Sequence, residues 1–532
     1  MTRAQLDAFT SLVGSLLFKA HKACETPPIH FPLKMANILQ AVVLFLIMLV
    51  SAKALRPSSS SSFIGLKKGR YWNAIKDSND ASLPPDFELR TYSQTLDHFN
   101  YGPESYITFQ QRYAINFKYW GGASTSSPIF LYTGDESSLD GDLFVGFLVD
   151  NALRFKALLI FVEHRYYGES NPFGSKEAAH KNSTTLQYFS SAQALADYAE
   201  LLRYLKQNLS AENSPVIAMG GSYGGMLAAW FRLKYPHMVI GALASSAPIL
   251  YFDDITPQNG YCSVATNDFK ETSESCYQTI KSSWIEIDNI AAKQNGLATL
   301  SQMFNTCSLL NKTDELKEAL EGLYFGCAQY DNPNWNPVSR ICDAIDGEPN
   351  GTTVLKRIIS GMNAILGNST CHNFSETEDD MRAGWDWQDD MRSGWDWQVC
   401  TEMVMPIGCS GENIMFEASP FDLKNYSLWC NKRFNVNPRP HWITTEYGGI
   451  NIKKVLERFG SNILFSNGLR DPYSSGGVLQ NISNSIVALT TAKGSHCLDI
   501  SEANVADPDW LISQRNAEVQ IMENWIEEYN AK

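Results

Sequence analysis

The chain has 532 residues, of which 43 are Lys or Arg and 57 are Asp or Glu, so its formal net charge is −14. This acidic balance argues against partners such as nucleic acids and anionic membrane surfaces. An apolar content of 44% with 12% aromatic residues is typical of a well-packed globular protein. The length suits one large domain with an insertion, or two domains.

Near the N-terminus, an apolar run at residues 41–50 precedes the small-x-small triplet Ala52-Lys53-Ala54. The run is too short to cross a membrane and is typical of a signal peptide. Because Met35 starts this signal naturally, we interpret residues 1–34 as a spurious or unstructured extension and residues 35–54 as the signal peptide. Residues 55–85, rich in Ser, Lys and Asn, are expected to form a loose leader, and no later apolar stretch predicts a membrane anchor.

Residues 86–252 alternate between strand-like and helix-like patterns. Apolar runs at 128–134, 157–162 and 239–244 suit central parallel strands, and residues 192–207 suit a helix. This alternation predicts a doubly wound α/β fold.

A Gly-x-Ser-x-Gly string, Gly220 to Gly224, joins the apolar run 215–219 to a helix-like run that begins near Met226. This is the layout of a nucleophile elbow, in which small neighbours let the strand and the helix cross closely. The hydroxyl of Ser222 would project above the sheet, beside a helix N-terminus that favours developing negative charge. We predict that Ser222 is a catalytic nucleophile, with an ordinary tight turn as the alternative.

A triad on this fold continues in the order acid, then histidine. Asp471 follows a strand-like run at 462–465, and His496 lies on a glycine-bearing loop after a strand-like run at 486–490. Asp471 would orient the imidazole of His496, which would act as the general base. The alternatives are a turn-forming aspartate and a solvated loop histidine.

Between these parts, residues 253–435 form a segment of different character, and 249 residues separate Ser222 from Asp471. Nine of the 11 cysteines lie in it, no CxxC pair occurs, and stretches such as 309–323 look helical. We predict disulfides formed in an oxidising compartment rather than a metal site. The expected architecture is an α/β-hydrolase core whose second part is 436–532, with a large disulfide-rich helical cap inserted before the acid and the histidine.

Eight Asn-x-Ser/Thr sequons accompany the predicted signal peptide and favour a glycosylated secretory protein. They begin at Asn182, Asn208, Asn311, Asn350, Asn368, Asn373, Asn425 and Asn481. A second local feature is a string, 379–388, that recurs almost verbatim as 389–398. Two copies do not make a repeat architecture, so we interpret them as a tandem duplication or an assembly error rather than a functional site.

Several strings together resemble the lysosomal Pro-Xaa carboxypeptidase and dipeptidyl peptidase II family of serine peptidases. The resemblance runs from about Leu96 to the C-terminal helix, and the strings around Met405 and Trp442 look closer to the carboxypeptidase branch. The strings are EHRYYGES at 163–170, AQALADY at 192–198, GGSYGG at 220–225, TEMVMP at 401–406, RPHWIT at 439–444 and FSNG at 465–468.

The resemblance implies cleavage on the carboxyl side of proline, through an acyl-enzyme, with Ser222, Asp471 and His496 as the triad and no cofactor. The substrates would be peptides with a penultimate proline. The backbone N–H of Tyr223 would stabilise the oxyanion, with a second donor from the Gly134-Asp135 loop, assigned to Gly134. By position, Met226, Met405 and Tyr473 would line the proline pocket; core packing is the alternative for both methionines.

The family's disulfides would map to Cys262–Cys409, Cys276–Cys342, Cys307–Cys371 and Cys400–Cys430. Cys327 and Cys497 are left over, and we hypothesise that they pair. Cys497 stands where the mammalian-type pattern has a second histidine, and Tyr473 stands where it has tryptophan. Glu163 and Arg165 are expected to form a buried ion pair.

Other readings of the sequence stay open. The first is a dipeptidyl peptidase that removes N-terminal Xaa-Pro pairs, and more distant ones are an esterase and a non-enzymatic binding protein on the same fold. The expected location is the lysosome, the vacuole or the extracellular space. The family often forms homodimers, so the resemblance allows one here.

Overall fold

The computed structural model describes residues 84, 86–143, 145–367, 369–374 and 387–532. The predicted upstream extension, the signal peptide and nearly all of the leader lie outside the described residues. So do most of the first copy of the repeat and the sequon at Asn368.

The core is one eight-stranded mixed sheet with the order β1-β2-β4-β3-β5-β6-β7-β8. The six strands from β3 to β8 run parallel, and β1 and β2 form an antiparallel hairpin whose second strand pairs with β4. The strands are β1 Glu88–Thr95, β2 Thr108–Asn116, β3 Ile129–Thr133, β4 Leu158–Val162, β5 Val216–Gly221, β6 Gly241–Ser245, β7 Ile463–Gly468 and β8 Ile486–Thr491.

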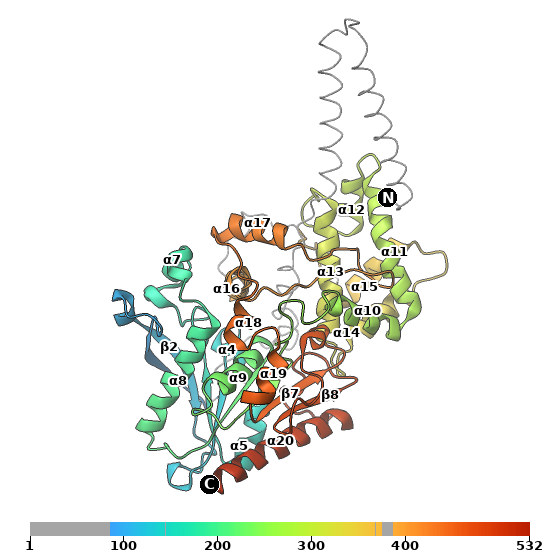
Figure 1. Ribbon diagram of the computed structural model, residues 1–532. Helices are drawn as coiled ribbons and strands as arrows, with labels where there is room; N and C mark the ends of the chain where they lie inside the picture. The colour runs from blue at the N-terminus through green and yellow to red at the C-terminus, as the bar shows by residue number, and fades with distance from the viewer. Residues whose placement is uncertain (1–83, 85, 144, 368, 375–386) are drawn as a thin grey trace, which may run out of the picture. The chain divides into compact units, whose positions relative to one another are not determined.

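Helices cover both faces of this sheet. Ile129 and Leu131 of β3 pack with residues of α8 and α9, whereas Phe130 and Tyr132 of the same strand pack with residues of α5 and α20. Successive side chains of a strand point to opposite faces, so an unbroken apolar strand requires a helical layer on each side. The predicted α/β fold is confirmed, and Figure 1 shows α20 at the base of the sheet, away from the helices of the insertion.

The first and last parts of the chain contribute the helices of the core. These are α4 Leu139–Asp142, α5 Gly146–Phe155, α6 Lys176–Ala179, α7 Ser183–Leu186, α8 Ser191–Asn208, α9 Ser222–Lys234, α18 Trp442–Tyr447, α19 Ile452–Phe459 and α20 Asp509–Asn530, with short 3-10 turns η2 Pro103–Tyr106, η3 Ala123–Thr125, η4 Pro172–Gly174 and η6 Pro472–Gly476.

Between β6 and β7 the described chain is helical, as predicted for the insertion (residues 253–435). Helices α10, α11, α13, α14 and α15 contact one another and lie together beyond the ends of the strands (Figure 1). The helices are α10 Gly260–Thr272, α11 Glu274–Ala291, α12 Gly296–Met303, α13 Thr313–Gln329, α14 Pro337–Asp346, α15 Val354–Leu366, α16 Trp387–Thr401 and α17 Leu423–Phe434.

Four disulfides occur among the described residues, all within the insertion, and they are the four that the resemblance implies. They join Cys262 to Cys409, Cys276 to Cys342, Cys307 to Cys371 and Cys400 to Cys430. Cross-links of this kind restrict the unfolded chain and so stabilise a segment whose described residues form no sheet of their own. Neither Cys327 nor Cys497 takes part in a disulfide, so the hypothesis that they pair with each other was wrong.

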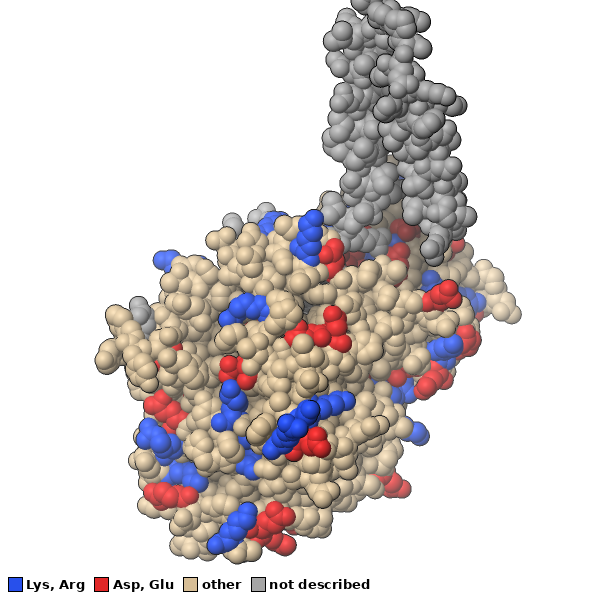
Figure 2. All heavy atoms as spheres, in the orientation of Figure 1, with Lys and Arg blue, Asp and Glu red and all other residues tan. Residues whose placement is uncertain are grey.

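On the face of the molecule in Figure 2, acidic and basic side chains are interspersed among uncharged ones rather than gathered by sign. Seven of the eight sequon asparagines lie in the described part of the chain; six of them are exposed and Asn425 is half-buried. Within the described ranges, no helix combines the length and apolar character needed to cross a membrane.

Candidate active site

Ser222 lies at the turn between β5 and α9 in a strained backbone conformation. Its φ is 55°, in the left-handed region that non-glycine residues rarely adopt. The glycines on either side are required by close contacts, since a Cβ on Gly220 would lie 2.3 Å from the carbonyl oxygen of Gly224, and one on Gly224 would lie 2.6 Å from that of Thr133. The string therefore forms the strand-turn-helix elbow predicted from sequence, with Ser222 half-buried at the first position of α9.

His496 and Asp471 form a buried pair on the loops that follow β8 and β7. The Nδ1 atom of His496 lies 2.7 Å from Oδ2 of Asp471, and both side chains are almost fully buried. The other carboxylate oxygen of Asp471 accepts the backbone N–H of Tyr473 at 3.0 Å. Two fixed bonds to one carboxylate set the orientation of the imidazole and favour the tautomer that carries its proton on Nδ1.

The histidine loop lies against the elbow. A Cβ built on Gly221 would approach Sγ of Cys497 to 2.8 Å, so the residue before Ser222 contacts the residue after His496. The Nε2 atom of His496 is buried and has no hydrogen-bond partner among the described residues. The arrangement leaves this nitrogen able to take a proton from a hydroxyl at the elbow.

The electrostatic surroundings of His496 favour its charged form. Burial acts to lower the pKa of His496, but the charge and hydrogen bond of Asp471, together with the neighbouring Cys497, raise it more, and the net pKa lies well above the ordinary histidine value. Stabilisation of the imidazolium is what a general base needs once it has accepted a proton.

The structure corrects the prediction that Gly134 supplies an oxyanion donor. The N–H of Gly134 donates to the carbonyl of Val162 at 3.1 Å, as a continuation of the β3–β4 pairing, so it is already engaged. The carbonyl of Gly134 accepts the hydroxyl of Tyr198 at 3.1 Å. The loop is thus held from both sides, and the N–H that follows next along it is that of Asp135.

All three residues predicted to line the substrate pocket are buried. Tyr473 packs against the imidazole of His496, with 5.6 Å between ring centroids, and Met226 lies one helical turn after Ser222 on α9. Met405 lies just after α16 and belongs to the same apolar cluster as the other two.

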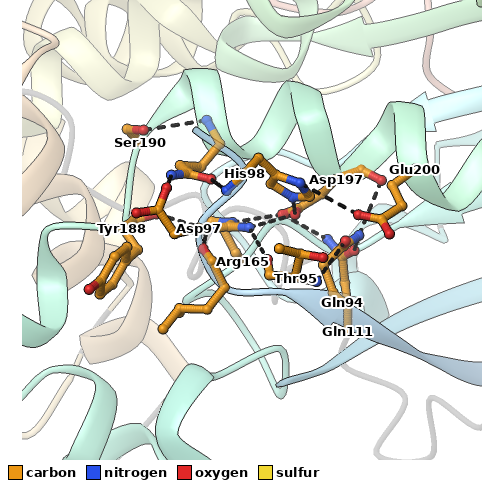
Figure 3. A network of polar contacts seen from close by, with 12 residues as sticks. Gln94, Thr95, Asp97, His98, Gln111, Arg165, Tyr188, Ser190, Asp197 and Glu200 are labelled. Carbon is orange, nitrogen blue, oxygen red and sulfur yellow. Dashed lines mark hydrogen bonds and ion pairs between the residues drawn. The ribbon is translucent and has the colours of Figure 1, made fainter. Parts of the chain in front are cut away.

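The expected Glu163–Arg165 ion pair is wrong, because Arg165 pairs with Asp197 and Glu163 lies 3.7 Å from Arg112. Figure 3 shows the surroundings of Arg165. Arg165 is fully buried and binds Asp197 of α8 through two nitrogens, at 2.7 and 2.5 Å. His98 adds a third contact to the same carboxylate at 2.7 Å. Glu163 instead accepts the backbone N–H groups of Leu139 and Glu169. The carboxylates of Asp197 and Glu163 thus each hold part of the core in place.

Comparisons with known proteins agree with this geometry. A family model described as serine carboxypeptidase S28 matches residues 94–518. The lysosomal Pro-X carboxypeptidase of Homo sapiens is 39% identical, over 85% of this chain and 91% of its own. The prolyl carboxy peptidase like protein 5 of Caenorhabditis elegans is 32% identical, over 79% of this chain and 87% of its own. The thymus-specific serine protease of Mus musculus is 30% identical, over 82% of this chain and 87% of its own.

Proposed function

The chain belongs to the serine carboxypeptidase S28 family and is a serine-type peptidase, and we propose that it releases the C-terminal residue from peptides whose penultimate residue is proline. The predictions of this family and of this enzyme class are confirmed. The observation that carries the proposed site is the buried pair of His496 and Asp471, 2.7 Å apart, with the histidine loop in contact with the elbow of Ser222.

In the proposed mechanism, Oγ of Ser222 attacks the carbonyl carbon of the proline while Nε2 of His496 accepts the hydroxyl proton. The N–H of Tyr223, and that of Asp135 as the second donor, bind the oxyanion. His496 then returns the proton to the departing amine, the C–N bond breaks, and the proline becomes an ester on Ser222. Water activated by His496 hydrolyses that ester.

For the proline pocket, we propose Met226, Met405 and Tyr473. A pyrrolidine ring needs apolar walls and offers no amide hydrogen, and these three side chains are apolar or aromatic and buried. Met226 lies one helical turn after Ser222, and Tyr473 packs against the imidazole of His496. The relatives named Pro-X carboxypeptidase, at 38–39% identity, favour this specificity over that of a dipeptidyl peptidase.

The same comparisons support a proposal for the route through the cell. We propose that the protein enters the secretory pathway through residues 35–54 and reaches the lysosome, the vacuole or the extracellular space. The exposure of six sequon asparagines supports glycan attachment there. Four disulfides fit an oxidising compartment.

The test uses the mature protein and a Ser222→Ala control at pH 5 and pH 7. One peptide ends in Pro-Phe and is acetylated at its N-terminus; a second begins with Lys-Pro and is amidated at its C-terminus. We expect serine-dependent release of Phe from the first peptide, faster at pH 7 than at pH 5, because the raised pKa of His496 leaves more of the base protonated at the lower pH. Release of Lys-Pro from the second peptide alone would move the assignment to a dipeptidyl peptidase, and cleavage of neither would contradict proline-directed exopeptidase activity.

A further inference from the structure

The side chain of Tyr223, the residue after the proposed nucleophile, is held by one polar group from the insertion and one from the core. Its hydroxyl accepts Nε2 of Gln398 at 2.8 Å and lies 2.9 Å from Nε2 of His164. The ring of Trp395 packs edge-on against the tyrosine ring, with 5.4 Å between centroids. Gln398 and Trp395 belong to α16, whereas Tyr223 and His164 belong to the core.

The hydrogen bonds around this hydroxyl have one consistent set of directions. Nδ1 of His164 lies 2.7 Å from the carbonyl oxygen of Arg165, so it must carry a proton and donate. Burial lowers the pKa of His164 to about 4, so the ring is neutral and its Nε2 accepts the proton of Tyr223. The hydroxyl of Tyr167 donates to Oε1 of Gln398 at 2.6 Å, which directs the amide nitrogen towards Tyr223.

The chain of bonds continues to a buried carboxylate. Nε2 of Gln398 also donates to Oε1 of Glu402 at 3.2 Å, and that oxygen accepts the backbone N–H of Ser191 at 2.8 Å. Ser191 is the first residue of α8, and a helix N-terminus stabilises a carboxylate. The hydroxyl of Ser191 donates to Oε2 of Glu402 at 3.0 Å and accepts Tyr447. These side chains are all fully or almost fully buried, and a buried network with every member satisfied is rigid.

We infer that Gln398 is a positioning residue for the oxyanion donor: through the hydroxyl of Tyr223, it fixes the backbone N–H that would bind the transition state. The inference deepens the proposed function and rests on it. Phenylalanine would fill the same space as Tyr223, so packing alone does not require two polar partners bonded to its hydroxyl and four more polar side chains linked behind them. An oxyanion donor must be held to a fraction of an ångström, and the network meets that requirement.

The chain offers a matched control. Gln398 is the last residue of the second copy of the repeated string, and Gln388 has the same position in the first copy. The variants are Gln398→Leu, Tyr223→Phe, both together, and Gln388→Leu. The readouts are kcat and KM on the acetylated Pro-Phe peptide, the rate of Ser222 labelling by a fluorophosphonate, and the melting temperature.

For Gln398→Leu we expect kcat and the labelling rate to fall about 10- to 100-fold, with KM within about twofold of wild type. Tyr223→Phe keeps the ring but removes the hydroxyl. Adding Gln398→Leu to that variant should lower kcat and the labelling rate by less than about a further threefold, because both substitutions remove the same hydrogen bond. Gln388→Leu should match wild type. Wild-type labelling and kcat in Gln398→Leu, or independent effects of the two substitutions, would overturn the inference alone. Failure of wild type to be labelled at Ser222 would overturn the proposed nucleophile and the inference together.

Discussion

The backbone N–H of His496 donates to the carbonyl of Gln329 over 2.9 Å, which bonds the histidine loop to the last residue of helix α13. Two residues further on, Asp331 binds the guanidinium of Arg470 at 2.8 Å, and Arg470 directly precedes Asp471. The end of one insertion helix therefore holds both loops that carry the proposed acid and base. The insertion is part of the frame of the site as well as a cover over it.

Removal of the charge on Asp331 tests this role of α13. In Asp331→Asn the guanidinium of Arg470 keeps only its longer contact to Asp268, at 3.6 Å. We expect kcat to fall about tenfold as the loop of Asp471 loosens, and the free energy of unfolding to fall by about 2 kcal/mol, less than for a fully buried pair. Urea denaturation and steady-state kinetics measure the two effects.

The control for Asp331→Asn is Glu523→Gln, which removes an ion pair with the exposed side chain of Arg154. We expect that variant to lie within about 0.5 kcal/mol of wild type, with unchanged kcat. Equal behaviour of the two variants would mean that the Arg470 pair is an ordinary surface contact.

The pH dependence of activity follows from the raised pKa of His496. A protonated imidazole cannot act as a base, so kcat/KM should be lost as the pH falls through that pKa. Asp471→Asn removes the largest of the contributions that raise the pKa of His496, so the acid limb of the profile should move to lower pH. The same variant should lose about 10⁴-fold in kcat, because the tautomer is no longer fixed. A pH–rate profile with an unmoved acid limb would show that a group other than His496 controls it.

The sequence predicted the parallel strands and the elbow because each is a local pattern of apolar runs and glycines. It did not predict the hairpin of β1 and β2, since β1 is mostly exposed and lacks an apolar run. The partner of Arg165 was missed for a related reason: Glu163 is close in sequence, but Asp197 reaches the guanidinium only once α8 packs on the sheet. The engagement of the Gly134 N–H likewise depends on strand pairing.

The contacts between the insertion and the triad were beyond sequence reasoning for the same physical reason. Gln329 acts through its backbone carbonyl, which any residue carries, so its identity gives no signal. Gln398 and Glu402 lie in or beside a string that supported the resemblance, and a glutamine and a glutamate that flank Cys400 could have drawn attention to α16. Their link to Tyr223 still required the fold.

A second pH effect concerns stability. Burial raises the pKa of both Asp499 and Glu518, and the charge of Asp499 raises that of Glu518 further. Asp499 accepts the hydroxyl of Ser245 and Glu518 that of Ser466, each at 2.6–2.7 Å, and the charge of Arg515 only partly offsets the burial. The folded protein therefore keeps a proton that the unfolded chain releases above about pH 4.

The stability that Asp499 and Glu518 contribute is therefore present at low pH and is lost as the pH rises towards their raised pKa values. Glu518→Gln supplies a permanent donor in place of the proton. We expect its free energy of unfolding to exceed that of wild type at pH 8 by at least about 1 kcal/mol, with the advantage shrinking towards pH 5. Denaturant titrations at several pH values check this, and parallel curves for the two proteins would contradict a shared proton.

The duplicated string permits a deletion that separates sequence from structure. Residues 379–388 and 389–398 differ only at Ala383 and Ser393, so removal of the first copy leaves one copy that still runs directly into Val399 and Cys400. From Gly394 onwards the side chains of the second copy are buried, and Gln398 bonds Tyr223. We expect the shortened protein to keep kcat within about twofold and an unchanged melting temperature, because the contacts that position the proposed oxyanion donor remain.

A control adds Gln398→Leu, in the numbering of the full chain, to the shortened protein. This substitution should lower kcat by the same factor as it does in the full chain. A tenfold loss on deletion alone would assign the first copy a role in the site.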